Sequence, residues 1–293
     1  MASARPHADE DGLTAILKKF KKEASMPRTI HAVLMILASL ATTSLWADPA
    51  SVTFTQPAAQ IVRYDLVEVA ANVSSPASRN CFTDASLAGT LETTDGARRW
   101  NVEGFCDAAD GTVFRIRFMA PIAGSYKYSV TYKQGSFTQS TAGQFQAVEA
   151  HRRGILAGDP QYPWHFIWQG TGEHYFFNGT TAYWLVNWRD DHVIHFTIDR
   201  LHRLKVNRMR VTIAGREAST FFGEPVMTGP NFTVLTAAWI AQNAEDPLHP
   251  GFDYTRYNLD YWQRFDRMLK FARERDMVIS LVLDMGEIGR AHV

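Results

Sequence analysis

The sequence predicts two domains, an N-terminal antiparallel β-sandwich followed by an α/β domain whose parallel sheet is covered by helices. The length of 293 residues corresponds to two domains of about 150 residues each. Between residues 51 and 148 apolar and polar side chains alternate with a period of two, as in strands that cover a core on one side only. After Gly154 strand-like and helix-like apolar segments alternate, which is typical of a parallel sheet.

The composition is that of an ordinary globular protein. Hydrophobic residues make up 46% and charged residues 20%. The mean hydropathy is -0.20. These values exclude a disordered, collagen-like or mostly membrane-embedded chain. The 30 basic and 30 acidic side chains cancel, so nothing in the overall charge favours nucleic acid as a partner.

Residues 1–47 have the features of an upstream segment and a secretory signal peptide. Arg28 supplies a basic start, an apolar stretch follows, and small residues precede Ala47, where we expect cleavage. A retained anchor is the alternative, although the apolar stretch is short for a bilayer. We therefore expect a secreted or periplasmic protein without a stable membrane span once the signal is removed.

The segment before Met26 has two interpretations. Its four lysines either extend the basic region of the signal peptide or follow from a start codon placed too far upstream. We favour the second interpretation, because a signal peptide that begins at Met26 is already complete.

The expected sandwich occupies residues 48–149. Alternation is clearest in three segments, each of which has apolar side chains on one face of the expected strand. These side chains are Val67, Val69, Ala71 and Val73; Phe114, Ile116 and Phe118; and Tyr126, Tyr128, Val130 and Tyr132. Asp-Gly, Ala-Gly and Gln-Gly pairs supply turns between such runs.

Cys81 and Cys106 are the only cysteines, and both fall in this domain. An oxidising compartment would allow them to form a disulfide, and two unpaired buried thiols are the alternative. With no third cysteine and no C-x-x-C pair, a thiolate zinc site is not expected.

The second domain is expected to contain three strands and two helices. An apolar run within residues 175–186 is suited to a buried strand, and Asp190 or Asp191 can cap a helix that carries Ile194 and Ile198. Further segments indicate strands at 206–213 and 277–283 and a helix over 259–272.

Both domains resemble parts of bacterial glycoside hydrolases. The segments 120–128 and 143–148 resemble the end of the immunoglobulin-like domain of unknown function that precedes the catalytic domain in many of these enzymes. The segments 179–183, 207–210 and 261–284 are similar to the first part of a (β/α)8 TIM barrel of the cellulase-like and apiosidase-like superfamily. Two departures from that pattern are Asp276, where glycine is usual, and Gly286, where histidine is common.

The resemblance implies a fragment. Residues 150–286 would form only a partial barrel, because a complete one needs about 250 residues and eight strands. Residues 287–293 resemble the translation of a sequencing adapter, and we expect them to be an artefact. The catalytic carboxylates would then lie outside the fragment, which would be inactive by itself.

Arg210 and Asp284 are the polar candidates for the site, because each is expected near the carboxyl end of a strand, where barrel active sites lie. By the resemblance, Arg210 supports catalysis by hydrogen bonding to the nucleophilic carboxylate. A structural or surface role is the alternative for both residues.

Trp184 and Trp188 offer rings for stacking on sugars, with core packing as the alternative. His192 and His195 lack an evident third ligand, so we expect no metal and no cofactor.

Two functions follow from this interpretation. The first is an exported, retaining glycoside hydrolase that acts on a polysaccharide or oligosaccharide. The second is a non-catalytic carbohydrate- or matrix-binding surface protein.

Overall fold

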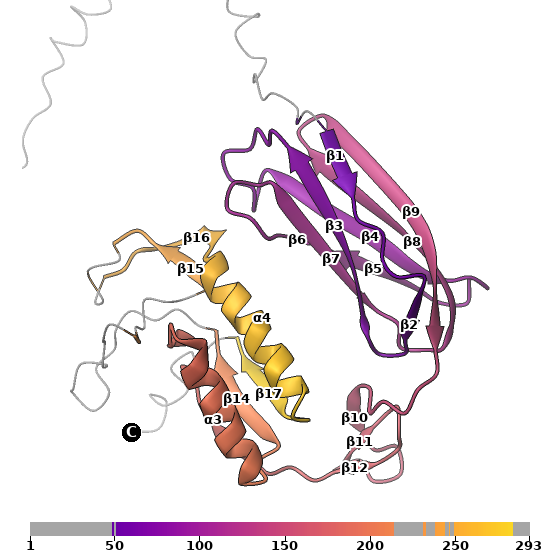
Figure 1. The fold of residues 1–293 in the computed structure, drawn as a ribbon, viewed down its shortest axis with the longest axis vertical. Coiled ribbons are helices and arrows are strands. Elements are labelled where there is room, and N and C mark those ends of the chain that lie inside the picture. Colours follow the sequence, from indigo (N-terminus) through magenta and orange to yellow (C-terminus); the bar gives the residue numbers. More distant parts are fainter. Residues whose placement is uncertain are drawn as a thin grey trace, which may run out of the picture. The chain divides into compact units, whose positions relative to one another are not determined.

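The computed structural model describes residues 49, 51–213, 231–232, 238–243, 246 and 249–283. The expected signal peptide, Asp284 and the adapter-like segment lie outside these residues. Strands predominate in the described part, which also contains two α-helices and one 3-10 helix (Figure 1). No helix in that part is both long and apolar enough to cross a membrane.

Residues 51–148 form two sheets whose inner faces share one core (Figure 1). The strands of the first sheet are, in spatial order, β1 (Ser51–Phe54), β3 (Leu66–Ser74), β7 (Val113–Met119) and β6 (Phe105–Cys106). Those of the second are β2 (Gln60–Val62), β9 (Phe137–Val148), β8 (Gly124–Gln134), β4 (Ala85–Thr93) and β5 (Arg99–Glu103). One pairing differs from the antiparallel arrangement expected from the sequence, because β2 runs parallel to β9.

Strand β8 shows how the alternation builds this core. Tyr126, Tyr128, Val130 and Tyr132 are all at most 3% exposed. The ring of Tyr126 stacks on that of Phe145 in β9 at 5.2 Å between centroids. Gly143 in β9 makes room for Tyr128, since a Cβ at this position would lie 2.5 Å from the tyrosine hydroxyl oxygen. Large aromatic residues on one strand are thus matched by a residue without a side chain on the next.

Both cysteines are buried in the sandwich core as free thiols. The sulfur of Cys106 lies 3.0 Å from the carbonyl oxygen of Ala108, and that of Cys81 lies 3.7 Å from the same oxygen. Burial raises the pKa of the Cys106 thiol, and the neighbouring Cys81 thiol raises it further. Both sulfurs therefore lie near the carbonyl oxygen of Ala108. The disulfide between Cys81 and Cys106 stays a prediction.

A small antiparallel sheet follows the sandwich in sequence. It consists of β10 (Leu156–Gly158), β11 (Phe166–Trp168) and β12 (His174–Tyr175), with β11 in the middle. Almost all of its side chains are at least partly exposed.

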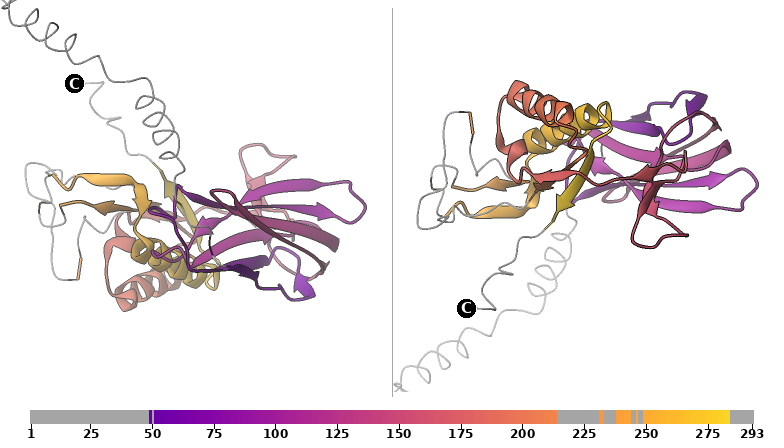
Figure 2. Two further views of the ribbon diagram at one scale, coloured as in Figure 1. Left: turned by 90° about the horizontal axis from the view of Figure 1, so that it is seen from above. Right: turned by 90° about the horizontal axis from the view of Figure 1, so that it is seen from below.

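A parallel sheet with two helices makes up the rest of the α/β part. Its strands are, in spatial order, β13 (Gly179–Thr181), β14 (Arg208–Thr212) and β17 (Val278–Val282). The helices are α3 (Asp191–Arg203) and α4 (Leu259–Arg273), and a hairpin of β15 (Trp239–Ala241) and β16 (Phe252–Tyr257) precedes α4. Both helices lie on the same side of β14 and β17 (Figure 2).

Both helices begin at a polar cap, and the sequence predicted the cap of α3. The Asp190 side chain accepts a hydrogen bond from the backbone of His192 at 2.8 Å, and Asn258 caps α4 in the same way through Tyr261. Ile194 and Ile198 of α3 are buried against Met209 and Val211 of β14 in one apolar cluster. The helical spacing in the sequence therefore identified the residues that cover this face of the sheet.

The expectation of a (β/α)8 barrel is wrong. The described residues form small separate sheets, and the parallel sheet has three strands, which is too few to close on itself. The strand expected from the apolar run within residues 175–186 is also different in the structure. Strand β13 ends at Thr181, and Leu185–Asn187 forms the 3-10 helix η1. A short apolar run does not by itself distinguish a strand from a helical turn.

Candidate functional site at the ends of the parallel strands

Arg210 lies on the face of the parallel sheet that the helices leave uncovered. Its neighbours in the strand, Met209 and Val211, are fully buried toward the helices, whereas Arg210 itself is exposed. This follows from the alternation of side chains along a strand. In register, Arg210 lies beside Thr181 of β13 and Ser280 of β17. The exposed face therefore carries a polar row across all three strands.

Arg208 shares this face but is held by its neighbours. Its Nε donates to the hydroxyl of Ser280 at 2.5 Å, and its guanidinium lies 4.1 Å from the centroid of the Phe177 ring. Arg210 has no such side-chain partner among the described residues. The two arginines thus differ within the described part of the chain: the side chain of Arg208 is held by Ser280 and Phe177, and none of the described side chains occupies the guanidinium donors of Arg210. Sequence reasoning selected Arg210 and overlooked Arg208, although a spacing of two along a strand places both on one face.

Trp184 and Trp188 lie at the two ends of η1, directly after β13. Trp188 is half-buried against the cluster beneath the sheet, and its ring is 5.1 Å from that of Phe232. Trp184 is also half-buried, but it makes no ring contact within the described residues. Of the two, Trp184 therefore has the less occupied ring for a sugar. Asp284, the fourth candidate, lies outside the described residues.

Buried polar residues of α4 support the ends of the strands. Tyr261 is 1% exposed and donates its hydroxyl hydrogen to the carbonyl oxygen of Thr212 at 3.2 Å, at the end of β14. Burial raises the pKa of Tyr261 well above its usual value, so the hydroxyl stays protonated and acts as a donor. This residue was not identified as a site residue from the sequence, where it falls only within the helix expected over 259–272.

Arg264 of α4 forms a hydrogen bond to the backbone of the turn that follows β13. Its side chain is buried, with Nη1 3.4 Å from the carbonyl oxygen of Val186 in η1 and Nη2 2.7 Å from Asp260. Asp191, the first residue of α3, accepts a hydrogen bond from Arg267 that lowers the pKa of its carboxyl group. Helix α4 therefore fixes both the turn that carries the tryptophans and the start of α3.

His192 and His195, the two histidines considered as metal ligands, both lie in α3. The ring of His195 stacks on that of Phe271 with a centroid distance of 3.8 Å and an interplanar angle of 10°. His192 is exposed near the start of the helix. Neither residue belongs to a group of ligands that is close enough to hold a metal ion within the described part of the chain.

The chemistry open to this face is recognition of an anion or a polar ligand. The planar guanidinium of Arg210 offers several N–H donors in a fixed fork, so it can orient or stabilise a carboxylate. No catalytic acid and no nucleophile are assigned among the described residues of this face.

Comparison with known proteins locates two similarities. Residues 50–133, which cover most of the sandwich, match a domain of unknown function, DUF5060. The fold resembles the crystal structure of a candidate glycoside hydrolase from Bacteroides vulgatus, with a TM-score of 0.57 and 18% sequence identity. That match covers 77% of this chain and 41% of the other protein, so the chain spans less than half the length of that relative.

Other similarities are too weak to support an argument. An endo-β-1,4-mannanase from Thermotoga petrophila matches with a TM-score of 0.23 and 11% identity, over 36% of this chain and 21% of that protein. A β-glucuronidase from Parabacteroides merdae matches with a TM-score of 0.21 and 12% identity, over 79% of this chain and 28% of that protein. No curated protein matches the sequence.

Proposed function

We propose that this chain forms part of a retaining glycoside hydrolase that acts on a polysaccharide or oligosaccharide outside the cytoplasm. The observation that carries the proposal is the guanidinium of Arg210, which has no side-chain partner among the described residues and is exposed on the parallel sheet of a fold similar to that of a candidate glycoside hydrolase. Residues 26–47, with their basic start and apolar stretch, support the export.

Arg210 has a defined task in such an enzyme. A retaining glycosidase uses two carboxyl groups roughly 5–5.5 Å apart, one as a proton donor and the other as an anionic nucleophile. A neighbouring cation favours the anionic form of a carboxyl group. The planar guanidinium can also hold the carboxylate in one orientation through two parallel hydrogen bonds. Arg210 is therefore proposed as a positioning residue for the nucleophile, and Trp184 as a platform for a sugar ring.

The test replaces Arg210 by lysine in the product of the complete coding sequence. Lysine keeps the charge but loses the fork, so we expect kcat to fall by at least about ten-fold with little change in KM. Arg208→Lys is the matched control, because Arg208 lies on the same strand and face but is already held by Ser280 and Phe177. It should change kcat less than two-fold.

Equal effects of the two substitutions would contradict the role of Arg210. Tight binding of a polysaccharide without any turnover by the unmodified protein would contradict the hydrolase. That result would support the non-catalytic carbohydrate-binding protein instead. Affinity electrophoresis on a panel of polysaccharides, followed by a reducing-sugar assay, distinguishes the two functions.

A further inference from the structure

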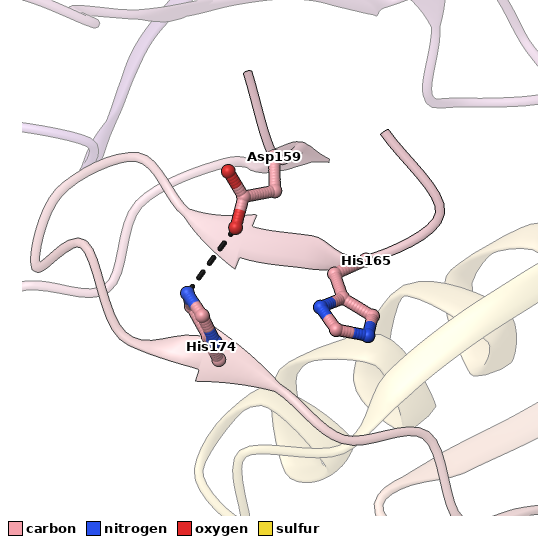
Figure 3. A group of neighbouring side chains, drawn as sticks. All are labelled: Asp159, His165 and His174. Carbon is pink, nitrogen blue, oxygen red and sulfur yellow. Dashed lines mark ion pairs between the residues drawn. The ribbon is translucent and has the colours of Figure 1, made fainter. Parts of the chain in front are cut away.

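Three side chains of the small sheet gather at one point (Figure 3). Asp159 directly follows β10, His165 directly precedes β11, and His174 begins β12. One ligand atom from each residue lies within 4.8 Å of the other two. Asp159 is buried, whereas both histidines are exposed. The carboxylate of the cluster is thus buried in the small sheet, and its two imidazoles are accessible to solvent.

The carboxylate of Asp159 is already oriented. Its Oδ1 accepts hydrogen bonds from the backbone N–H groups of Gln161 at 2.8 Å and Tyr162 at 3.2 Å. Its Oδ2 lies 3.2 Å from Nε2 of His174 and faces the cluster, as Figure 3 shows. One oxygen is therefore held by two backbone N–H groups, and the other is directed at the imidazoles. Hydrogen bonds of this kind orient a carboxylate for metal binding.

We propose that Asp159, His165 and His174 bind a single zinc ion. Two imidazole nitrogens and one carboxylate oxygen form a donor set that zinc accepts, and a water molecule would complete the tetrahedron. Hard cations such as magnesium and calcium prefer oxygen ligands alone, so this donor set disfavours them. The inference is independent of the proposed hydrolase, because none of these residues belongs to the parallel sheet.

The distances fit a tetrahedral site after a small adjustment. With metal–ligand bonds of 2.0–2.1 Å, adjacent ligand atoms of a tetrahedron are about 3.3 Å apart. The pair of Asp159 and His174 already has nearly this separation, at 3.2 Å. The remaining separations, up to 4.8 Å, require the ligand atoms to approach by roughly 1.5 Å. Rotation of exposed histidine side chains can supply that movement without rearranging the backbone.

A bound metal ion would stabilise the small sheet, which lacks buried apolar side chains. Between residues 151 and 178, all of which are described, Asp159 is the only buried residue. A sheet without an apolar core of its own gains stability from a metal or a disulfide. Each ligand comes from the end of a different strand, so one zinc ion would join β10, β11 and β12. The centroids of the Tyr162 ring and of both imidazoles also lie within 6.3 Å of one another, so the two histidine rings are close together on the same side of the sheet.

The test measures zinc binding to the full chain, purified without a polyhistidine tag and stripped with a chelator. Competition with a chromophoric chelator gives stoichiometry and affinity, and cobalt, which absorbs visible light in tetrahedral sites, reports the geometry. We expect one zinc ion per chain and a tetrahedral cobalt spectrum. His165→Asn and His174→Asn should each weaken binding at least ten-fold, because loss of a hydrogen-bond partner of a ligand alone costs about 10–100-fold in metal affinity.

His249→Asn is the matched control. His249 forms an exposed pair with Asp246 at 3.2 Å, which resembles the pair of His174 and Asp159 but belongs to no three-ligand group in the described part of the chain. This variant should bind zinc within two-fold of the unmodified chain. Both cluster histidines are exposed, so their replacement should leave the circular dichroism spectrum unchanged. Absence of bound zinc at micromolar concentrations, a loss of less than ten-fold in either cluster variant, or an equal loss in His249→Asn would overturn the proposal.

Discussion

At the scale of single residues, the two cysteines allow a direct test of the sandwich core. Cys81 and Cys106 both lie within hydrogen-bonding distance of Ala108, and each is buried. We expect them to form a disulfide in protein recovered from an oxidising compartment, since a bridge across a loop of roughly 25 residues stabilises by about 3 kcal/mol. Mass spectrometry of the unfolded, alkylated protein should show no labelled cysteine, and reduction should lower Tm.

The raised pKa of Cys106 defines the control for that experiment. A buried neutral thiol reacts slowly with alkylating reagents, so failure to label the folded protein would not indicate a disulfide. Labelling after unfolding removes this protection. Two labelled thiols in the unfolded, non-reduced protein would contradict the bridge.

Residue-scale prediction from the sequence was successful where one strand or helix determined the environment. The burial of Ile194 and Ile198 follows from helical periodicity alone. The group of Asp159, His165 and His174 was missed, because its members come from three strand ends and their proximity depends on how the strands pair. The spacing of these residues in the sequence contains no motif that indicates the cluster.

At the scale of elements, both helices end in the same backbone motif without glycine. After α3, the N–H of Val206 bonds to the carbonyl of Leu201 at 3.0 Å, and Lys205 has a φ of 63°. After α4, Met277 bonds to Ala272 in the same way, and Asp276 has a φ of 52°. This is the Schellman motif, whose left-handed position favours glycine. Asp276 also stands where glycine is usual in the family that this sequence resembles. Its positive φ explains why glycine suits that position.

We expect Lys205→Gly to stabilise the protein. Relief of the left-handed strain should exceed the added entropy of the unfolded chain by about 0.5–1 kcal/mol, which raises Tm by a few degrees. Lys205→Ala is the control: it removes the same side chain but retains a Cβ, so it should give no gain. Asp276→Gly should gain less than Lys205→Gly, because Asp276 also pairs with Arg153 at 3.1 Å. Differential scanning calorimetry measures all three, and a lower Tm for Lys205→Gly than for Lys205→Ala would refute the strain.

At the scale of the whole molecule, local patterns predicted several elements and a parallel sheet with helices, but not every strand pairing. The strands β14 and β17 and the helices α3 and α4 lie where apolar spacing predicts them, because each of these patterns is set within one element. The barrel came from resemblance, and it fails because closure depends on how many strands join and at what tilt. The parallel pairing of β2 with β9 is likewise a long-range feature that alternation does not encode.

The two apolar clusters lead to a prediction about cooperativity. One cluster contains only residues of the sandwich, from Val52 to Ala147, and the other only residues of the α/β part, from Leu185 to Met277. A unit with its own core can fold alone. We therefore expect a chain cut to residues 48–149 to show the far-ultraviolet circular dichroism of a β protein and a single cooperative urea transition.

The full chain provides the comparison that makes this test decisive. If each cluster unfolds as a unit, the full chain should show two urea transitions, and one of them should have the midpoint and slope of the isolated sandwich. Intrinsic tryptophan fluorescence assigns the other transition, because most of the tryptophans lie after residue 150. A disordered 48–149 fragment, or a single transition of the full chain with a slope close to the sum of the two, would show that the sandwich depends on the α/β part for its stability.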